Sequence, residues 1–224
     1  MSGQVRLKGA RKAIADHMMQ SLAGSAQLSF LTGCDVTDLL TAREGWKAGE
    51  RAIGVEDCLI AALADSMAAF PHFNGVSKGD ELILAEAVDV SVAISVNGLL
   101  LTPVIRRADR LSLDEIAACR RDQAARARSG KLKTSELVGG TATISNLGLT
   151  RVRHFTPILN KGQLVILGIG RIEPRLMLTA DGSVAQRQEI GLSLTVDHRF
   201  IDGDPAARLL GEICDRLTAI HTRN

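Results

Sequence analysis

The residues best suited to chemistry lie in one short segment, residues 194–204, where an apolar run gives way to polar side chains. It holds His198 and, four residues later, Asp202, which is followed by glycine. A histidine can act as a general base because its ordinary pKa lies near neutrality. The carboxylate could fix the surroundings of the imidazole. On these residues alone the alternatives stay open, since His198 could be structural, Asp-Gly a simple turn and Asp204 a helix N-cap.

Other familiar catalytic and cofactor signatures are missing from the sequence. There is no GxxxxGK[ST], no HExxH and no GxSxG, and the dinucleotide-like run from Gly168 has Glu173 where a third glycine is needed. Four cysteines lie far apart among apolar neighbours, without CxxC or zinc spacing: Cys34, Cys58, Cys119 and Cys214. We therefore expect buried, reduced thiols in a cytoplasmic protein and no metal site.

Composition limits the classes of protein that the chain could be. With 224 residues, of which 46% are hydrophobic and 23% charged, it can form one large domain or two small ones. The formal net charge is +2 and aromatic residues make up 3%, so neither a basic surface nor stacking platforms favour a nucleic-acid partner. No apolar run approaches the ~20 residues of a membrane span, and no signal peptide is indicated.

The hydrophobic pattern predicts the elements that must position these residues. Spacings of three and four predict helices, and alternation predicts strands. The expected helices cover 10–22, 37–43, 55–70, 112–128 and 204–220; the expected strands cover 28–36, 81–84, 88–96, 99–106, 141–145, 164–169, 175–179 and 186–196. Asn97-Gly98 and Asp181-Gly182 predict hairpin turns, and Ser112 with Glu115 a capping box. Together they predict one α/β domain over residues 1–224, a two-layer sandwich of helices on a mixed sheet.

Five motifs, in order along the chain, carry a resemblance to a known family. They are Arg11-Lys-Ala-Ile-Ala15; Asn97-Gly98 with Leu101-Thr-Pro-Val104; Gly130-Lys-Leu-Lys133; Gly139-Gly-Thr-Ala-Thr-Ile-Ser145-Asn-Leu-Gly148; and Asp197-His-Arg-x-x-Asp-Gly203. They resemble the catalytic domain of the dihydrolipoamide acyltransferase components of 2-oxoacid dehydrogenase complexes, over residues 5–217. Asp197 before His198 resembles this branch rather than the antibiotic-modifying one, which has His-His-x-x-x-Asp-Gly.

The resemblance implies a fold, an assembly and a reaction. The fold is that of chloramphenicol acetyltransferase, in a homotrimer whose active sites lie in channels between subunits. The reaction is acyl transfer between coenzyme A, as substrate, and a dihydrolipoyl thiol, with no metal. By this resemblance His198 is the base for the attacking thiol, Ser145 the hydroxyl that binds the oxyanion, and Asp202 the support of the histidine loop, paired with Arg11. Arg199 is expected to be a local anchor, and without the family Ser145 would simply end a strand.

Further expectations concern substrates and partners. The sequence contains no lipoyl-bearing hairpin, subunit-binding domain or Ala/Pro-rich linker, so we expect lipoyl groups in trans, from lipoyl domains and other complex components. Residues that contact coenzyme A are not assigned: Arg106, Arg107, Arg110, Arg120 and Arg121 could meet its phosphates or form a solvated face. Leu147 favours acetyl over succinyl transfer, and the polar end after Ile220 predicts trimers that assemble no further.

Departures from the family pattern keep two other functions open. Ala26-Gln27 replaces a Pro-His pair, Ala61 a lysine, and residues 160–163 read Asn-Lys-Gly-Gln instead of Asn-Pro-Pro-Gln. These positions border the substrate channel or the subunit contacts, so specificity could differ. One alternative is a trimeric structural core of a multienzyme complex, against which the intact His198 argues. The other is acyl transfer to an amine or hydroxyl acceptor.

Overall fold

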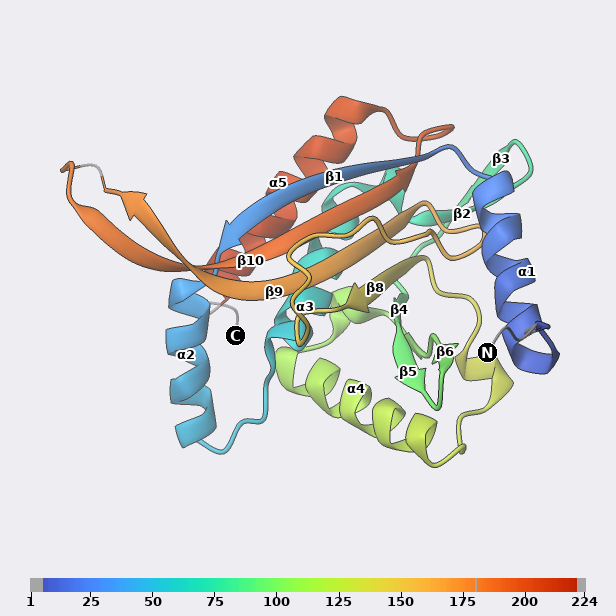
Figure 1. The fold of residues 1–224 in the computed structure, drawn as a ribbon, viewed down its shortest axis with the longest axis horizontal. Coiled ribbons are helices and arrows are strands. Elements are labelled where there is room, and N and C mark those ends of the chain that lie inside the picture. The colour runs from blue at the N-terminus through green and yellow to red at the C-terminus, as the bar shows by residue number, and fades with distance from the viewer. Residues whose placement is uncertain (1–5, 180, 221–224) are drawn as a thin grey trace, which may run out of the picture.

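An open mixed sheet forms the centre of the molecule in the computed structural model, which describes residues 6–179 and 181–220 (Figure 1). Its strand order is β1-β10-β9-β8-β4-β7. The strands are β1 (Gln27–Asp35), β4 (Val90–Val92), β7 (Val104–Ile105), β8 (Ala142–Asn146), β9 (Val165–Leu178) and β10 (Val184–Asp197). Because β8 runs parallel to β4 and β9 while the other neighbours are antiparallel, the predicted mixed sheet is confirmed.

Helices pack against the sheet and its edges, and not all of them contribute side chains to the core. They are α1 (Gly9–Ala23), α2 (Thr37–Ala48), α3 (Val55–Ala69), α4 (Leu113–Arg128) and α5 (Gly203–Ala219). Along β10, the alternate residues Ile190, Leu192, Leu194 and Val196 join the apolar core formed with α3 and α5. Alternation then places Ser193 and Thr195 on the other face of the sheet. The two faces of the sheet are therefore chemically different.

A long segment, residues 149–163, lies across the face of the sheet that carries Ser193. A Cβ on Gly170 or Gly191 would lie 1.8 or 2.0 Å from the carbonyl oxygen of Arg153, and one on Gly168 would lie 3.0 Å from the Phe155 ring. Side chains at these positions would push the segment off the sheet. The glycines that resemble a nucleotide motif in the sequence therefore serve close packing.

Local signals in the sequence are confirmed where the interaction is short in range. Ser112 Oγ accepts from the Glu115 amide at 3.3 Å, and Glu115 returns a bond to the Ser112 amide at 2.8 Å, which begins α4. The bonds that the Glu115 carboxylate accepts from the Ser112 amide and hydroxyl hold its pKa below the usual value. Asn97 and Gly98 have φ of 51° and 75° and join β5 (Ile94–Val96) to β6 (Leu99–Leu101), as the predicted hairpin requires.

Several predicted boundaries are wrong because non-local pairing decides them. The strand predicted over 88–96 is split between the main sheet, as β4, and a separate hairpin, as β5. Residues 99–106 also split, near Pro103, which has no N–H to donate. Conversely, the strands expected at 164–169 and 175–179 form one strand, β9; its Pro174 is tolerated because β8 ends opposite Ile169 and leaves that edge unpaired.

Helix limits differ in two further places. The second helix continues to Ala48, beyond the predicted end at residue 43, and α5 begins at Gly203 with Asp202, not Asp204, at its N-cap. A hairpin of β2 (Gly75–Lys78) and β3 (Glu81–Leu84) stands apart from the main sheet. The prediction that trimers assemble no further depends on residues 221–224, which lie outside the described residues.

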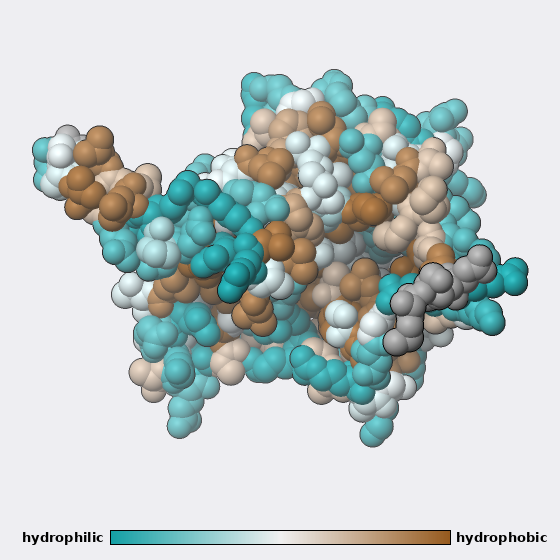
Figure 2. All heavy atoms as spheres, viewed as in Figure 1, coloured by the Kyte–Doolittle hydropathy of each residue, from teal (hydrophilic) through white to brown (hydrophobic). Residues whose placement is uncertain are grey.

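Strands β9 and β10 extend beyond the sheet as a two-stranded arm (Figure 1). Large apolar side chains are exposed near its end, where Figure 2 shows a brown patch: Leu176, Met177, Leu178 and Val184.

Among the described residues no helix is long and apolar enough to cross a membrane. Cys34 and Cys58 are buried, whereas Cys119 and Cys214 are partly exposed, and none of the four is in a disulfide.

Candidate functional site

His198 lies directly after β10, in the short turn that leads into α5. Its backbone amide donates to the Ala26 carbonyl at 2.7 Å, and the Ala26 amide donates to Asp197 Oδ1 at 3.2 Å. Asp197 is buried, with 1% of its side chain exposed. The turn is thus tied on both sides to the strand that precedes it and to the segment before β1.

The imidazole of His198 is oriented by a backbone carbonyl. Nδ1 lies 2.9 Å from the Ile201 oxygen, and a carbonyl can only accept, so Nδ1 carries the proton of the neutral ring. The lone pair is then on Nε2, and 43% of the side chain is exposed. A neutral imidazole with an accessible Nε2 can take a proton from a bound acid such as a thiol.

Asp202 contributes less to the imidazole than its spacing suggests. Its carboxylate is 3.9 Å from His198 Nδ1, too far for a hydrogen bond, and 89% of its side chain is exposed. Its backbone carbonyl accepts from the Ala206 amide in the first turn of α5. Arg11, the expected partner of Asp202, instead donates to the Gly98 carbonyl. The Arg11–Asp202 pairing is therefore not formed in this structure.

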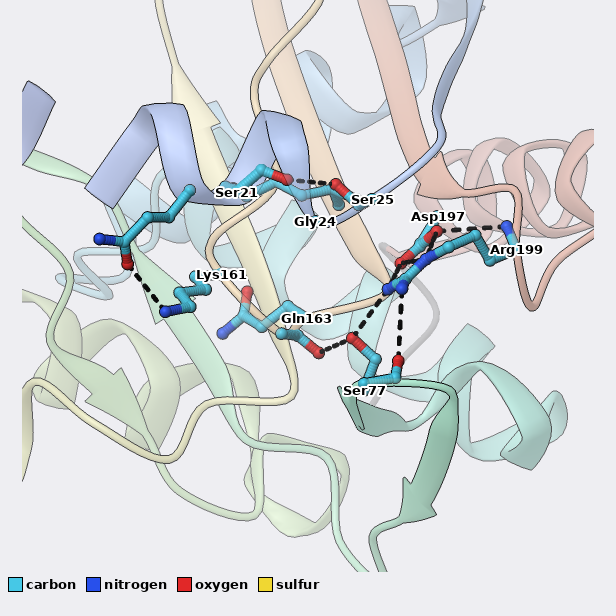
Figure 3. A pocket seen from close by; sticks show the side chains of 12 residues that line it. Ser21, Gly24, Ser25, Ser77, Lys161, Gln163, Asp197 and Arg199 are labelled. Carbon is cyan, nitrogen blue, oxygen red and sulfur yellow. Dashed lines mark hydrogen bonds and ion pairs between the residues drawn. The ribbon is translucent and has the colours of Figure 1, made fainter. Parts of the chain in front are cut away.

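Arg199 anchors the histidine turn to the β2–β3 hairpin. Its Nη2 and Nε lie 2.6 and 3.0 Å from the Asp197 carboxylate, and it also donates to Ser77 Oγ and the Gly79 carbonyl. The bonds to Asp197 raise the pKa of Arg199 above its usual value. Figure 3 shows these contacts along a polar hollow of about 250 Å³ that Lys161 also lines. The expected role of Arg199 as a local anchor is confirmed.

Ser145 lies on β8 and lines a hollow of a different kind, of about 240 Å³. Most of its wall is apolar: Met18, Ala93, Leu100, Phe155, Pro157, Ile158 and Ile166. Its other lining residues are uncharged, namely Thr102, Thr143 and Asn160. An adjoining hollow of about 270 Å³ shares Asn160, which His17 of α1 contacts through a bond of 2.9 Å. Ser145 therefore faces surroundings that disfavour charge.

Sheet register separates Ser145 from His198 within one chain. Ser145 pairs with Gly168, which pairs with Ser193, and Ser193 lies five residues before His198. Five residues at about 3.3 Å each give roughly 16 Å along the strands, and two strand spacings add about 10 Å across them. The two side chains are therefore on the order of 19 Å apart and cannot act on one reacting atom in a single chain.

Gln163 is a structural contributor to which sequence reasoning assigned no role, since it is the unchanged last residue of the Asn-Lys-Gly-Gln segment. Its Oε1 accepts from Thr143 Oγ1 at 2.5 Å, while Nε2 donates to the Gly140 carbonyl at 2.8 Å and to Ser91 Oγ at 3.3 Å. All these groups are buried or backbone. Gln163 thus joins the segment 149–163 to β4 and β8, and its partners come from distant sequence positions that no local pattern connects.

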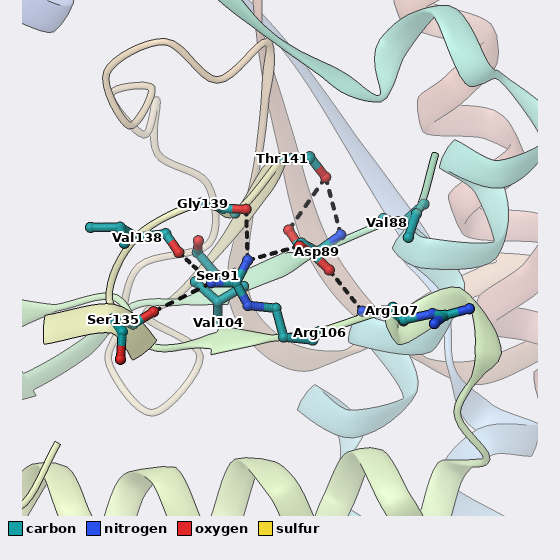
Figure 4. A network of polar contacts seen from close by, with 12 residues as sticks. Val88, Asp89, Ser91, Val104, Arg106, Arg107, Ser135, Val138, Gly139 and Thr141 are labelled. Carbon is teal, nitrogen blue, oxygen red and sulfur yellow. Dashed lines mark hydrogen bonds and ion pairs between the residues drawn. The ribbon is translucent and has the colours of Figure 1, made fainter. Parts of the chain in front are cut away.

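Most of the five arginines considered for coenzyme A have internal partners. Arg106 donates to the Asp89 carboxylate at 2.8 Å and to the Gly139 carbonyl at 2.9 Å, and the Arg107 amide donates to Asp89 (Figure 4). The remaining contacts are Arg110 with Asp109, Arg120 with Asp57 and Glu56, and Arg121 with the Ala52 carbonyl. Among the described residues no group of His, Cys, Asp or Glu could hold a metal ion.

Comparison with known proteins places the chain in a family. The model described as "2-oxoacid dehydrogenases acyltransferase (catalytic domain)" matches residues 2–222. The dihydrolipoyllysine-residue acetyltransferase component of the acetoin cleaving system of Bacillus subtilis is 37% identical over 218 residues, covering 92% of this chain and 53% of that protein. A probable succinyltransferase component of the 2-oxoglutarate dehydrogenase complex of Schizosaccharomyces pombe is 33% identical, over 92% and 48%. The chain spans about half the length of the curated relatives it matches.

Solved structures agree with the fold. Dihydrolipoamide acetyltransferase of Azotobacter vinelandii aligns with a TM-score of 0.93 at 30% identity, over 99% of this chain and 93% of that one. The study of that enzyme concerned a serine, a histidine and an asparagine in its catalytic mechanism. The cubic core of a pyruvate dehydrogenase complex aligns equally well, at 0.93 and 29%, over 99% and 93%. A chloramphenicol acetyltransferase, at 0.57 and 18% over 91% and 92%, shares the fold.

Proposed function

Because the chain belongs to the family of 2-oxoacid dehydrogenase acyltransferase catalytic domains, we propose that it transfers an acyl group between coenzyme A and a dihydrolipoyl thiol. The observation that carries the proposal is the fixed His198 imidazole, with Nδ1 held by the Ile201 carbonyl and Nε2 without a hydrogen-bond partner among the described residues. Single-domain organisation over residues 1–224 is part of the proposal. The dihydrolipoyl group comes from a lipoyl domain outside the described residues, and the proposed location is the cytoplasm.

The base is needed because only a thiolate attacks a thioester well, and an ordinary thiol has a pKa of about 8.5. His198 Nε2 takes the proton as the thiol sulfur bonds to the thioester carbonyl carbon. When the tetrahedral intermediate collapses, the carbon–sulfur bond to the departing thiol breaks and the imidazolium returns the proton to that sulfur. In both states Nδ1–H stays on the Ile201 carbonyl, so the ring does not turn. Asp202 supports the loop in this proposal, from a position 3.9 Å from Nδ1.

Ser145 supplies the hydroxyl that donates to the oxyanion of the intermediate. Its uncharged, largely apolar hollow supports this role, because few polar groups there compete with the oxyanion for the hydroxyl proton. Since Ser145 and His198 lie far apart in one chain, we propose that each active site combines His198 of one copy with Ser145 of another, in a homotrimer. The reaction requires no metal.

Mixed assembly tests the shared site directly. Chains with His198→Ala and chains with Ser145→Ala should each be nearly inactive alone. Unfolded and refolded together in equal amounts, they should regain about a quarter of the wild-type activity, since one interface in four then joins two intact residues. No recovery, with trimers verified by light scattering, would show that both residues act within one chain.

Acetyl is the proposed acyl group. Among the described residues that line the Ser145 hollow none is charged, so a succinyl carboxylate there would lose its hydration without a cationic partner. The value of kcat/KM with acetyl-CoA should exceed that with succinyl-CoA by at least about 100-fold, equivalent to ~2.7 kcal/mol. Equal values would reverse the assignment.

The first experiment measures steady-state transfer from acetyl-CoA to free dihydrolipoamide, with His198→Ala as the comparison. Activity that falls several hundredfold in the variant supports the proposal. The cubic core among the structural relatives suggests the alternative, an architectural role. A folded trimer inactive with acetyl-, isobutyryl- and succinyl-CoA would favour that alternative, and turnover with an amine or hydroxyl acceptor alone would replace lipoamide.

A further inference from the structure

A polar network of Asn146, Glu56, Arg120 and Asp57 connects the helices to Asn146, the residue after Ser145. Asn146 Nδ2 donates to Glu56 Oε1 at 3.2 Å, and Glu56 Oε2 lies 3.2 Å from Arg120 Nη1. Arg120 in turn binds both oxygens of Asp57, at 2.5 and 3.1 Å. The contacts thus join α4, the first turn of α3 and the end of β8.

The part of this polar network formed by Asp57 and Arg120 is held by several hydrogen bonds. Asp57 is fully buried, and its Oδ2 also accepts from the Gly54 amide at 2.7 Å, where α3 begins. The two-pronged bond to Asp57 fixes the plane of the guanidinium and raises the pKa of Arg120, which stays charged. Glu56 and Arg120 are each about four-fifths buried, so their ion pair is screened little by water.

The outer end fixes the backbone that carries Ser145. Asn146 Oδ1 accepts from the Gly148 amide at 2.8 Å, and the Leu147 amide donates to Ile169 of β9 at 2.8 Å. Neighbouring side chains on a strand point to opposite faces. Holding Asn146 on the helical face therefore holds Ser145 toward its hollow on the other face.

We infer that Glu56 is a positioning residue for Ser145, held by Arg120 and acting through Asn146. This inference rests on the proposed function, in which Ser145 binds the oxyanion. An oxyanion donor must be placed within a few tenths of an ångström, and its complete loss costs about 10²–10³ in rate. Loosening β8 at Asn146 should cost a part of that.

Kinetics of two variants at one position separate positioning from folding. Glu56→Ala should lower kcat about tenfold and leave KM for acetyl-CoA within about twofold, because the intermediate is affected more than the bound substrate. Glu56→Gln keeps an oxygen for Asn146 and should retain at least about a third of kcat. Asp114→Ala is the matched control, because Arg51–Asp114 also links α4 to the segment before α3 but is an exposed ion pair that includes none of Asp57, Glu56, Arg120 and Asn146. It should leave kcat unchanged.

Hydrogen exchange provides a readout that does not depend on activity. The Gly148 amide should exchange at least about fivefold faster in Glu56→Ala than in wild type or Asp114→Ala, while amides in the middle of α3 stay protected. Unchanged exchange at Gly148, or equal kcat in Glu56→Ala and wild type, would overturn the inference. A wild-type protein without transferase activity would refute the proposed function instead, and the exchange experiment would still decide whether Glu56 fixes this turn.

Discussion

His198, after β10, and Ser145, on β8, lie in surroundings of different kinds. His198 sits in a turn secured by backbone hydrogen bonds and the Asp197–Arg199 ion pair. Ser145 sits on a strand, and its side chain faces a largely apolar wall. A group that moves a proton needs one defined tautomer, which a backbone carbonyl provides, whereas a group that stabilises a negative oxygen needs surroundings from which water is excluded.

The largest effect on kcat is expected at His198, in the polar turn after β10 (the polar end). Replacing His198 by Ala removes the proposed base and should reduce kcat by about 10²–10⁴, because the attacking thiol is then deprotonated only by solvent. The measurement is steady-state acetyl transfer, with His72→Ala, an exposed histidine elsewhere, as control. A loss under tenfold would mean that Nε2 of His198 is not where the proton goes.

At Ser145, which faces the largely apolar hollow, the expected loss of kcat is somewhat smaller. Ser145→Ala removes the proposed oxyanion donor and should lower kcat by about 10²–10³ with little change in KM, since in the proposed mechanism the hydroxyl acts mainly on the intermediate. Ser95→Ala, on the exposed side of β5, should behave as wild type. A rise in KM at constant kcat would instead assign Ser145 to substrate binding.

Removal of the ion pair beside His198 tests whether that end depends on buried charge. Arg199→Ala leaves the Asp197 carboxylate buried without its cation and should lower the free energy of unfolding by roughly 2–3 kcal/mol, less than a fully buried pair because Arg199 is partly exposed. Urea unfolding measures it. The exposed pair Arg208–Asp204 provides the control, and Arg208→Ala should cost under about 0.5 kcal/mol. Equal losses in the two variants would make Arg199 an ordinary surface residue.

The sequence was sufficient where a signal is local and insufficient where it depends on pairing between distant segments. The capping box at Ser112 and the Asn97-Gly98 turn follow from neighbouring residues, and both are confirmed. The motifs identified the family, and with it the candidates His198 and Ser145. Their separation could not be predicted, because it follows from the register of three strands.

Buried polar partners were also beyond prediction. Gln163 bonds to Thr143 and Ser91, and Glu56 to Asn146, across gaps of twenty to ninety residues. Nothing in a local pattern distinguishes such a side chain from one on a solvated face. The Arg11–Asp202 pair expected from the resemblance is not formed within one chain, where Arg11 reaches the Gly98 carbonyl instead.

The smallest effect is expected at Asp202, although it belongs to the motif that identified the family. At 3.9 Å from Nδ1 and largely exposed, its carboxylate acts on the imidazolium only through a solvent-screened field. Asp202→Asn should therefore reduce kcat less than about tenfold, and the loss should shrink further as salt is raised from 0.05 to about 0.5 M. Asp204→Asn, on the first turn of α5, controls for the change in net charge. A loss above 100-fold that salt does not reduce would mean that Asp202 gains a buried partner from a neighbouring subunit, and would make the polar end, like the Ser145 end, dependent on assembly.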